Sequence, residues 1–257
     1  MINTLWSIPT LLAGIASSVI AADRVPPIST PERRTPVMVE LFTSEGCSSC
    51  PPADLLLEKL DQSQPVPGAI IIALSEHVDY WNHIGWADPY SSPVFSSRQA
   101  AYACRFHLEG SYTPQMIVDG TTEFVGSDWS RAQSTIAGAT KLDKVGIHLS
   151  PVPGAVRIEV DAISSPAGRG KADVYFVLAQ DSGTSNVLRG ENQGRRLHHV
   201  AIVTNIQQVG IVTAKMAFTK DVPVGGHGDL KGVRIIVFVQ EPENGRVLGA
   251  AMLRAAQ

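Results

Sequence analysis

The sequence predicts an α/β domain followed by an all-β, sandwich-like domain, and three observations carry this prediction. Between residues 37 and 143, apolar strand patterns alternate with apolar-periodic helices. After residue 144, short apolar runs recur between Gly, Pro, Asn and Asp residues, as in β-sandwiches and barrels. An apolar leader opens the chain. We therefore expect a signal peptide over 1–22, a linker over 23–36, and domains over 37–143 and 144–257.

The first domain is expected to follow the order β-α-β-α-β-β-α. This is the order of the thioredoxin-like fold, which has a central mixed sheet flanked by helices. The strands are predicted over 37–42, 69–74, 115–118 and 123–125, and the helices over about 49–60, 94–107 and 129–142. A long segment rich in aromatic residues, 76–93, separates the second strand from the second helix.

The second domain is expected to consist of short strands joined by turns. Seven alternating apolar runs carry this prediction, over 145–149, 156–160, 174–179, 200–206, 212–218, 233–240 and 247–252. The change in pattern places the domain boundary near residues 143 and 144.

The composition indicates a globular protein without a nucleic-acid partner. Of the 257 residues, 44% are hydrophobic and 18% are charged, which provides enough apolar material for a core. The net charge of -3 and the isoelectric point near 6.2 argue against binding to nucleic acid.

The first 22 residues predict export from the cytoplasm. Residues 5–20 carry no charged side chain, and Ala21 and Ala22 offer small residues for cleavage. The alternative is an uncleaved membrane anchor, although the run is slightly shorter than the ~20 apolar residues of a usual span. Both alternatives place the rest of the chain in the periplasm or outside the cell, where disulfides persist.

The most informative motif is Cys47-Ser48-Ser49-Cys50, which lies between the first predicted strand and the first predicted helix. A helix N-terminus carries partial positive charge, so a cysteine there ionises more readily, and the thiolate attacks disulfides. We interpret Cys47 as the more exposed nucleophile and Cys50 as the resolving thiol, with their disulfide as the redox group and no other cofactor. Cys104 is interpreted as a small buried core residue rather than a third redox thiol.

Three further residues are candidates for the redox site. Thr113 and Pro114 immediately precede the third predicted strand. Glu40 lies within the first strand, on the face opposite Val39. A buried carboxylate beneath a dithiol relays protons because burial raises its pKa. The alternative for Glu40 is a salt-bridged or rim-exposed position, whereas Glu45 is expected to be exposed in the turn.

The aromatic segment allows two roles. It forms a capping loop that shields the sheet edge, or Trp81 and Trp86 contact a substrate. His77 and His83 are the residues that would bind copper or zinc together with the two thiolates, but we favour the capping role for both.

Polar segments of the second half are expected to be peripheral. His198, His199 and His227 are interpreted as turn or surface histidines. The polar loop over 189–196 is expected to dock the second domain on the first, without specifying chemistry.

The stretch 39–54 (VELFTSEGCSSCPPAD) closely resembles an exported bacterial family known as domain of unknown function 1223, which has a thioredoxin-like fold. Further matches lie at 77–81 (HVDYW), 112–115 (YTPQ) and 189–192 (RGEN). The resemblance implies a thioredoxin-like domain with an appended β domain, and it implies no settled function.

The broader likeness to thioredoxin carries over three positions, Cys47, Cys50 and Pro114. It implies that Pro114 follows a cis peptide bond and packs against the dithiol, and that the preceding Thr113 contacts the partner chain.

These features predict an exported thiol–disulfide oxidoreductase whose partner is a protein dithiol or disulfide. A copper-binding or other metal-binding chaperone module is one alternative, with Cys47 and Cys50 as ligands and His77 or His83 beside them. The other alternative is a non-enzymatic interaction protein in which the disulfide is purely structural. The sequence predicts no oligomeric state.

Overall fold

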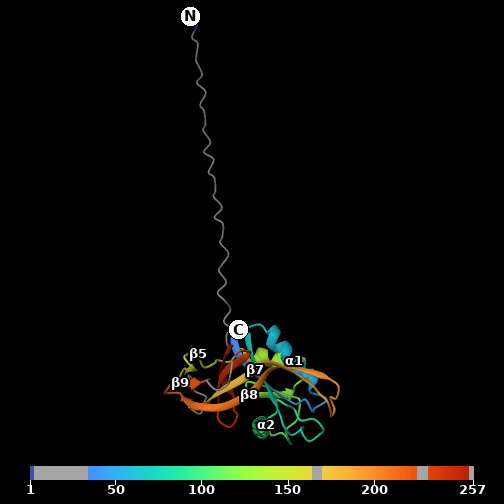
Figure 1. Ribbon diagram of the computed structural model, residues 1–257. Coiled ribbons are helices and arrows are strands. Elements are labelled where there is room, and N and C mark those ends of the chain that lie inside the picture. The colour runs from blue at the N-terminus through green and yellow to red at the C-terminus, as the bar shows by residue number, and fades with distance from the viewer. Residues whose placement is uncertain (3–33, 164–169, 225–230, 255–257) are drawn as a thin grey trace. The chain divides into compact units, whose positions relative to one another are not determined.

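An eight-stranded mixed sheet runs through both predicted domains, in the order β11-β10-β7-β8-β2-β1-β3-β4. Two of its strands, β7 and β8, are labelled in Figure 1. Its strands are β1 (Thr35–Thr43), β2 (Ala69–His77), β3 (Gln115–Val118), β4 (Thr122–Val125), β7 (Lys171–Asn186), β8 (Arg196–Thr213), β10 (Val233–Gln240) and β11 (Val247–Arg254). A second, three-stranded sheet has the order β5-β6-β9, with β5 (Ile147–Val152), β6 (Ala155–Val160) and β9 (Phe218–Pro223). The helices are α1 (Pro51–Ser63), α2 (Pro93–Arg105) and α3 (Trp129–Ala139).

The computed structural model describes residues 1–2, 34–163, 170–224 and 231–254. Almost all of the predicted signal peptide and linker, as well as His227, therefore lie outside the described residues. Within the described ranges, no helix is long and apolar enough to cross a membrane.

Strand β1 is central to the first half because both of its edges are paired. It runs parallel to β2 along its whole length and antiparallel to β3, and β3 forms a hairpin with β4. The predicted alternation of its side chains is confirmed. Val39 and Leu41 pack in the core with α1, whereas Met38 and Phe42 belong to clusters on the opposite face.

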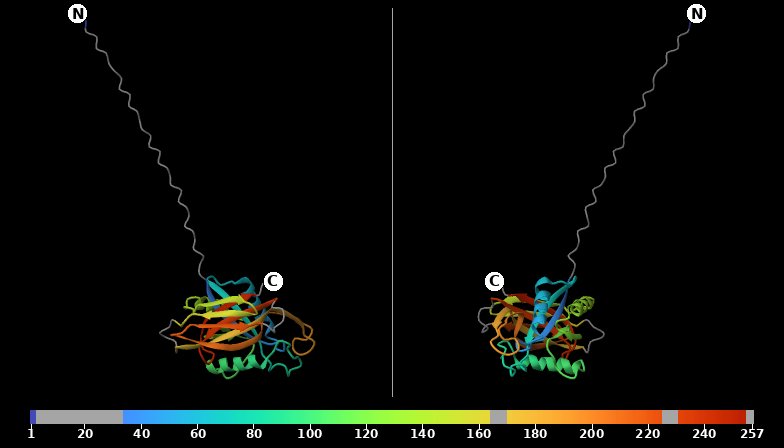
Figure 2. Two further views of the ribbon diagram at one scale, coloured as in Figure 1. Left: turned by 60° about the vertical axis from the view of Figure 1, so that its left-hand side comes forward. Right: turned by 90° about the vertical axis from the view of Figure 1, so that its right-hand side faces the viewer.

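The helices cover both faces of this part of the sheet. Apolar residues of α1 and α3 share one core cluster with alternate residues of β1, among them Leu57 and Ile136. On the other face, Phe95 of α2 packs with Met38 of β1 and Phe238 of β10. In both views of Figure 2, α2 (green) lies on one side of the sheet and α1 (cyan) on the other. The mixed α/β class is therefore confirmed.

The predicted boundary at residues 143 and 144 does not separate two bodies, since the described residues on both sides of it belong to one compact unit. Strand β8 lies beside β2 and runs parallel to it where Ser75 meets Ile202. Val200 and Ala201 of β8 complete the apolar cluster under α1. The strand that pairs with the free edge of β2 thus comes from the second half, and one core runs through both halves.

Several strands differ in length from their predictions, and β2 and β8 are two of them. Strand β2 continues through Glu76 and His77 because these residues pair in register with Phe42 and Thr43 of β1. The separate strands predicted over 200–206 and 212–218 are wrong. Residues 196–213 form the single strand β8, which pairs with β7 along nearly its whole length, so the polar residues in its middle do not break it.

The side chain of Glu40 is buried and ion-paired on the α2 face of the sheet. Its Oε1 atom accepts a hydrogen bond from Nε of Arg98 at 2.7 Å, and Tyr102 donates to Oε2 at 2.6 Å. Arg98 also donates to Gln240 and Asn244, which lie in the second half of the chain. The salt-bridged alternative for Glu40 is therefore the observed one.

We predict that Arg98→Met lowers the free energy of unfolding by about 3–5 kcal/mol, because it leaves the buried carboxylate of Glu40 without its cation. Urea denaturation at neutral pH measures this loss. The matched control is Arg157→Met, which removes an arginine from an exposed pair with Asp221 and changes stability little. Equal effects of the two substitutions would contradict the assignment.

Candidate functional site

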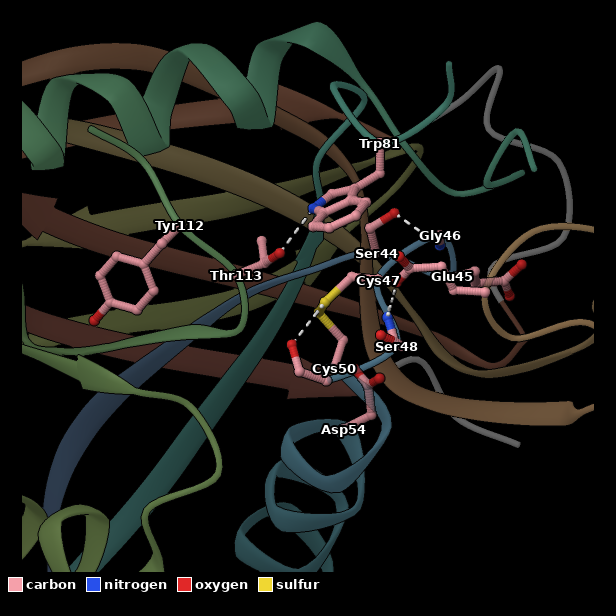
Figure 3. The surroundings of a disulfide bond; sticks show 12 residues. Ser44, Glu45, Gly46, Cys47, Ser48, Cys50, Asp54, Trp81, Tyr112 and Thr113 are labelled. Atoms are coloured by element: carbon pink, nitrogen blue, oxygen red, sulfur yellow. Dashed lines mark hydrogen bonds between the residues drawn. A yellow bond between two sulfur atoms is a disulfide. The ribbon is translucent and has the colours of Figure 1, made fainter. Parts of the chain in front are cut away.

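A disulfide joins Cys47 and Cys50 at the turn between β1 and α1 (Figure 3). The Cα atoms of the two cysteines are 5.4 Å apart. The backbone N–H of Cys50 donates to the carbonyl of Cys47 at 3.2 Å, and Cys50 is the N-cap of α1. Pro51 and Pro52 occupy the first helical positions, where a missing N–H leaves no helical hydrogen bond unmade.

Both cysteines are fully buried, which corrects the expectation that Cys47 is the more exposed of the two. Only Ser48 and Ser49 of the motif are exposed. Trp81 lies over the turn, since its Cβ is 3.0 Å from the position that a Cβ on Gly46 would take. Figure 3 shows the Trp81 indole beside Cys47.

The Thr113–Pro114 peptide bond is cis, as the likeness to thioredoxin implied. The Thr113 hydroxyl accepts a hydrogen bond from Nε1 of Trp81 at 2.8 Å, so the loop before β3 anchors the indole (Figure 3). Pro114 lies close to the start of α1, because a Cβ on Gly126 would be 3.1 Å from Pro114 Cβ and 3.2 Å from Ala53 Cβ. Glycine at position 126 permits this close approach.

Glu45 is fully buried, and the prediction that it is exposed is wrong. Its carboxylate accepts a hydrogen bond from Nε1 of Trp86 at 2.8 Å and lies 3.2 Å from Nε2 of His199. Its backbone N–H donates to Asp88 at 2.8 Å. The loop between β2 and α2 (residues 78–92, the aromatic loop) supplies two of these partners and so covers the turn.

His199 is also buried, in contrast to its predicted surface position. Nε2 faces Glu45, and Nδ1 lies 3.6 Å from Oδ1 of Asp54 in the first turn of α1. Burial disfavours the imidazolium, but the carboxylates of Asp54 and Glu45 outweigh it and raise the pKa of His199 to about 10. His199 is therefore a buried cation at neutral pH.

A second histidine–carboxylate pair lies against the first. Nδ1 of His77 is 2.7 Å from Oδ2 of Asp88, and the His77 and His199 rings meet edge to face with centroids 4.6 Å apart. Burial opposes ionisation of Asp88, yet the adjacent His77 and backbone N–H donors lower its pKa. His83 is exposed. Among the described residues, no group of three or more His, Cys, Asp or Glu side chains is arranged to hold a metal ion.

The loop between β7 and β8 (residues 187–195, the β7–β8 loop) binds the cysteine turn directly. The buried Asn192 donates from Nδ2 to the carbonyls of Glu45 and Cys47, each at 2.9 Å. The carboxylate of Glu191 accepts from the backbone N–H of Ser48 at 3.1 Å. The docking role predicted for this polar segment is thus confirmed, and its contacts reach the motif itself.

Two predicted residues lie away from this turn. The hydrogen-bond partners of Glu40 are Arg98 and Tyr102 of α2, rather than Cys47 or Cys50. Cys104 is a free, exposed thiol, which corrects its interpretation as a core residue. The buried face of α2 is formed by other positions, including Phe95 and Tyr102.

The residues that sequence reasoning missed are Asp54, His199 and Asn192. Asp54 had a usable signal, since an acid four residues after the second cysteine falls in the first turn of α1. His199 and Asn192 lie more than 140 positions from Cys47, and nothing in their local sequence pattern places them beside it.

The protein is therefore a mixed α/β protein with a buried disulfide at the start of a helix. The chain belongs to the family described as proteins of unknown function DUF1223, whose model matches residues 38–240. The resemblance stated from the sequence motifs is thereby confirmed.

Two solved structures are similar to this chain. A protein of Agrobacterium tumefaciens, solved as a structural-genomics target, is 27% identical over 88% of this chain and 97% of its own length, with a TM-score of 0.73. HBP35 of Porphyromonas gingivalis is 17% identical over 86% of this chain and 75% of its own length, with a TM-score of 0.57, and shares the fold. No curated protein matches the sequence.

We predict that the pH dependence of stability reveals the His199 cation. Because its folded-state pKa is raised from 6.5 to about 10, its contribution is fully present below pH 6.5 and is lost as the pH rises through about 10. Urea unfolding of the oxidised protein and of His199→Gln across this window measures the difference. The stability gap between the two proteins should narrow as pH rises, and a constant gap would refute a charged His199.

We further predict that Trp81→Ala increases the rate at which dithiothreitol reduces the disulfide severalfold, because the indole covers the turn that holds Cys47. The rate is measured by quenching the reaction at successive times and labelling the free thiols. Trp129→Ala is the matched control, since Trp129 packs against the α1 and α3 core. An unchanged rate in Trp81→Ala would show that the indole does not limit access.

Proposed function

We propose that this protein is an exported thiol–disulfide oxidoreductase with a thioredoxin-like first half. The observation that carries the proposal is the Cys47–Cys50 disulfide at the strand-to-helix turn, with the cis Thr113–Pro114 bond nearby. The element order from β1 to α3 and the pairing of β1 between β2 and β3 support the thioredoxin-like assignment.

The proposed reaction moves two electrons between this dithiol and a protein partner. A partner thiolate attacks Sγ of Cys47, the Cys47–Cys50 bond breaks, and Cys50 leaves as a thiolate that takes up a proton. A second partner thiolate then attacks the partner sulfur of the mixed disulfide, and Cys47 leaves as a thiolate. The partner is thereby oxidised and the dithiol reduced. The reverse sequence reduces a partner disulfide.

Two features bear on the partner and the compartment. Burial of the disulfide means that a partner must displace part of its cover, and Trp81 and Thr113 form a hydrogen-bonded part of that cover. Location in the periplasm or outside the cell rests on the apolar leader over residues 1–22. Such a compartment supplies protein substrates that carry disulfides.

Complete burial of both cysteines also favours a second candidate, in which the disulfide is only structural. The reduction potential separates the two. Structural disulfides of exported proteins lie below about -300 mV, whereas oxidoreductases of the thioredoxin class lie at about -270 mV or above. Equilibration with glutathione and dithiothreitol buffers measures it.

We predict that Cys50→Ser traps a mixed disulfide through Cys47, because the resolving thiol is missing. The background should be Cys104→Ser, since Cys104 is an exposed thiol that would capture proteins on its own. Non-reducing electrophoresis of protein expressed with its leader, followed by mass spectrometry of the adduct, identifies the cysteine.

The control is Cys47→Ser in the same background, which should trap far less. Absence of any adduct through Cys47 in the native compartment would reject the oxidoreductase, and a potential in the structural range would support the second candidate.

A further inference from the structure

We propose that His199, contributed by the second half of the chain, is a positioning residue that makes the Cys47–Cys50 pair more oxidising. It does so by compensating the charge of the two buried carboxylates that it contacts, Glu45 and Asp54. The inference deepens the proposed function and rests on it, because it concerns the redox poise of the same disulfide.

Both acidic residues are joined to the cysteine turn by short backbone links. Glu45 lies two residues before Cys47, so their Cα atoms are at most about 7.6 Å apart. The backbone N–H of Asp54 donates to the carbonyl of Cys50 at 3.1 Å. Figure 3 shows Asp54 and Glu45 among the residues around the disulfide. His199 contacts the carboxylates of both.

The cluster of Glu45, Asp54 and His199 contains two acidic side chains and one basic side chain. Glu45 and Asp54 are two carboxylates that face the single imidazolium of His199. One oxygen of Asp54 and Nδ1 of His199 have no hydrogen-bond partner, although both atoms are buried. These two atoms face each other at 3.6 Å. The imidazolium is therefore the charge that keeps this cluster near balance.

The other polar side chains against His199 are His77, Asp88 and Tyr90. His77 and Asp88 are hydrogen-bonded to each other, and the Tyr90 ring lies 5.8 Å from the His199 ring. The neighbouring His198 is exposed and points to Glu58 at 3.6 Å. The adjacent position on β8 therefore offers a histidine that does not belong to the cluster.

The direction of the effect follows from charge. Reduction of the disulfide consumes two electrons and one proton and leaves one thiolate and one thiol. A buried cation stabilises that thiolate, while the two carboxylates destabilise it, and buried charges are screened little by salt. A stabilised reduced form makes a dithiol pair a stronger oxidant. Removal of the imidazolium should therefore favour the disulfide, and removal of a carboxylate should favour the dithiol.

The test is the equilibrium of the purified, full-length protein with reduced and oxidised glutathione at pH 7, in the Cys104→Ser background. For His199→Gln, which keeps a hydrogen-bond donor but not the charge, we expect the equilibrium constant for reduction to fall about tenfold, equal to about 30 mV. Glu45→Gln should shift it in the opposite direction. The rate of Cys47 alkylation against pH should show the matching rise and fall of the thiol pKa.

The opposite signs separate electrostatics from loosened packing, which would move both variants in the same direction. His198→Gln is the matched control and should leave the equilibrium unchanged. Shifts of equal sign, or no shift in His199→Gln, would overturn the inference. If His199→Gln does not fold, Glu45→Gln and Asp54→Asn decide the matter, since each must then favour the reduced form.

The result is independent of partner capture. Opposed shifts in a protein that traps no partner through Cys47 would reject the proposed function while leaving the charge effect of His199 intact. A trapped partner, together with an unchanged glutathione equilibrium in the variants, would support the proposed function and reject the charge effect of His199.

Discussion

Buried carboxylates in the first half of the chain need compensating cations, and most of these cations come from the second half. A lone carboxylate in a protein interior costs several kcal/mol, so each must be paired or neutralised. One such pair, His77 with Asp88, lies wholly in the first half. Four further pairings are His199 with Glu45 and Asp54, Arg234 with Asp61, Lys144 with Asp119, and Arg98 with Glu40. Of the four basic residues in these pairings only Arg98 precedes residue 144, and Gln240 and Asn244 hold it in place. Residues 37–143 therefore do not reach charge balance by themselves.

The same dependence explains why the cysteine turn is so well covered. Its backbone carbonyls are held by Asn192, and the N–H of Ser48 is held by Glu191, both on the β7–β8 loop. From the other side, Trp86 of the aromatic loop binds Glu45. These two loops meet at Gly85 and Gly190. A Cβ on Gly85 would lie 3.3 Å from the Cα of Gly190, and both glycines have positive φ values. A bulkier residue at either position would separate the loops that cover the disulfide.

Local patterns in the sequence were sufficient for most of the elements and for the centre of the site. The alternation in β1, the proline-bounded end of α1 and the Cys-Ser-Ser-Cys motif each depend on neighbouring residues, so they were predictable. The core shared by both halves, the burial of Glu45 and the burial of His199 were not predicted, because each depends on contacts between distant segments. Pairing of β8 with β2 brings His199 to the turn that holds Glu45, and no periodicity in either strand encodes that pairing.

If the protein is the oxidoreductase proposed above, this arrangement would also bear on its selectivity. An exposed disulfide reacts with any thiol of suitable potential, whereas a covered one reacts at a rate set by the removal of its cover. The hydrogen bond between Trp81 and Thr113 ties the aromatic loop to the residue beside Pro114, so a partner that engages Thr113 competes with the indole directly. Binding and uncovering would then be one event, and a small thiol that makes no such contact would gain no access by it. At the exposed Ser48 the turn is held by Glu191, and release of this hydrogen bond would remove one of the contacts that bind the turn to the second half of the chain.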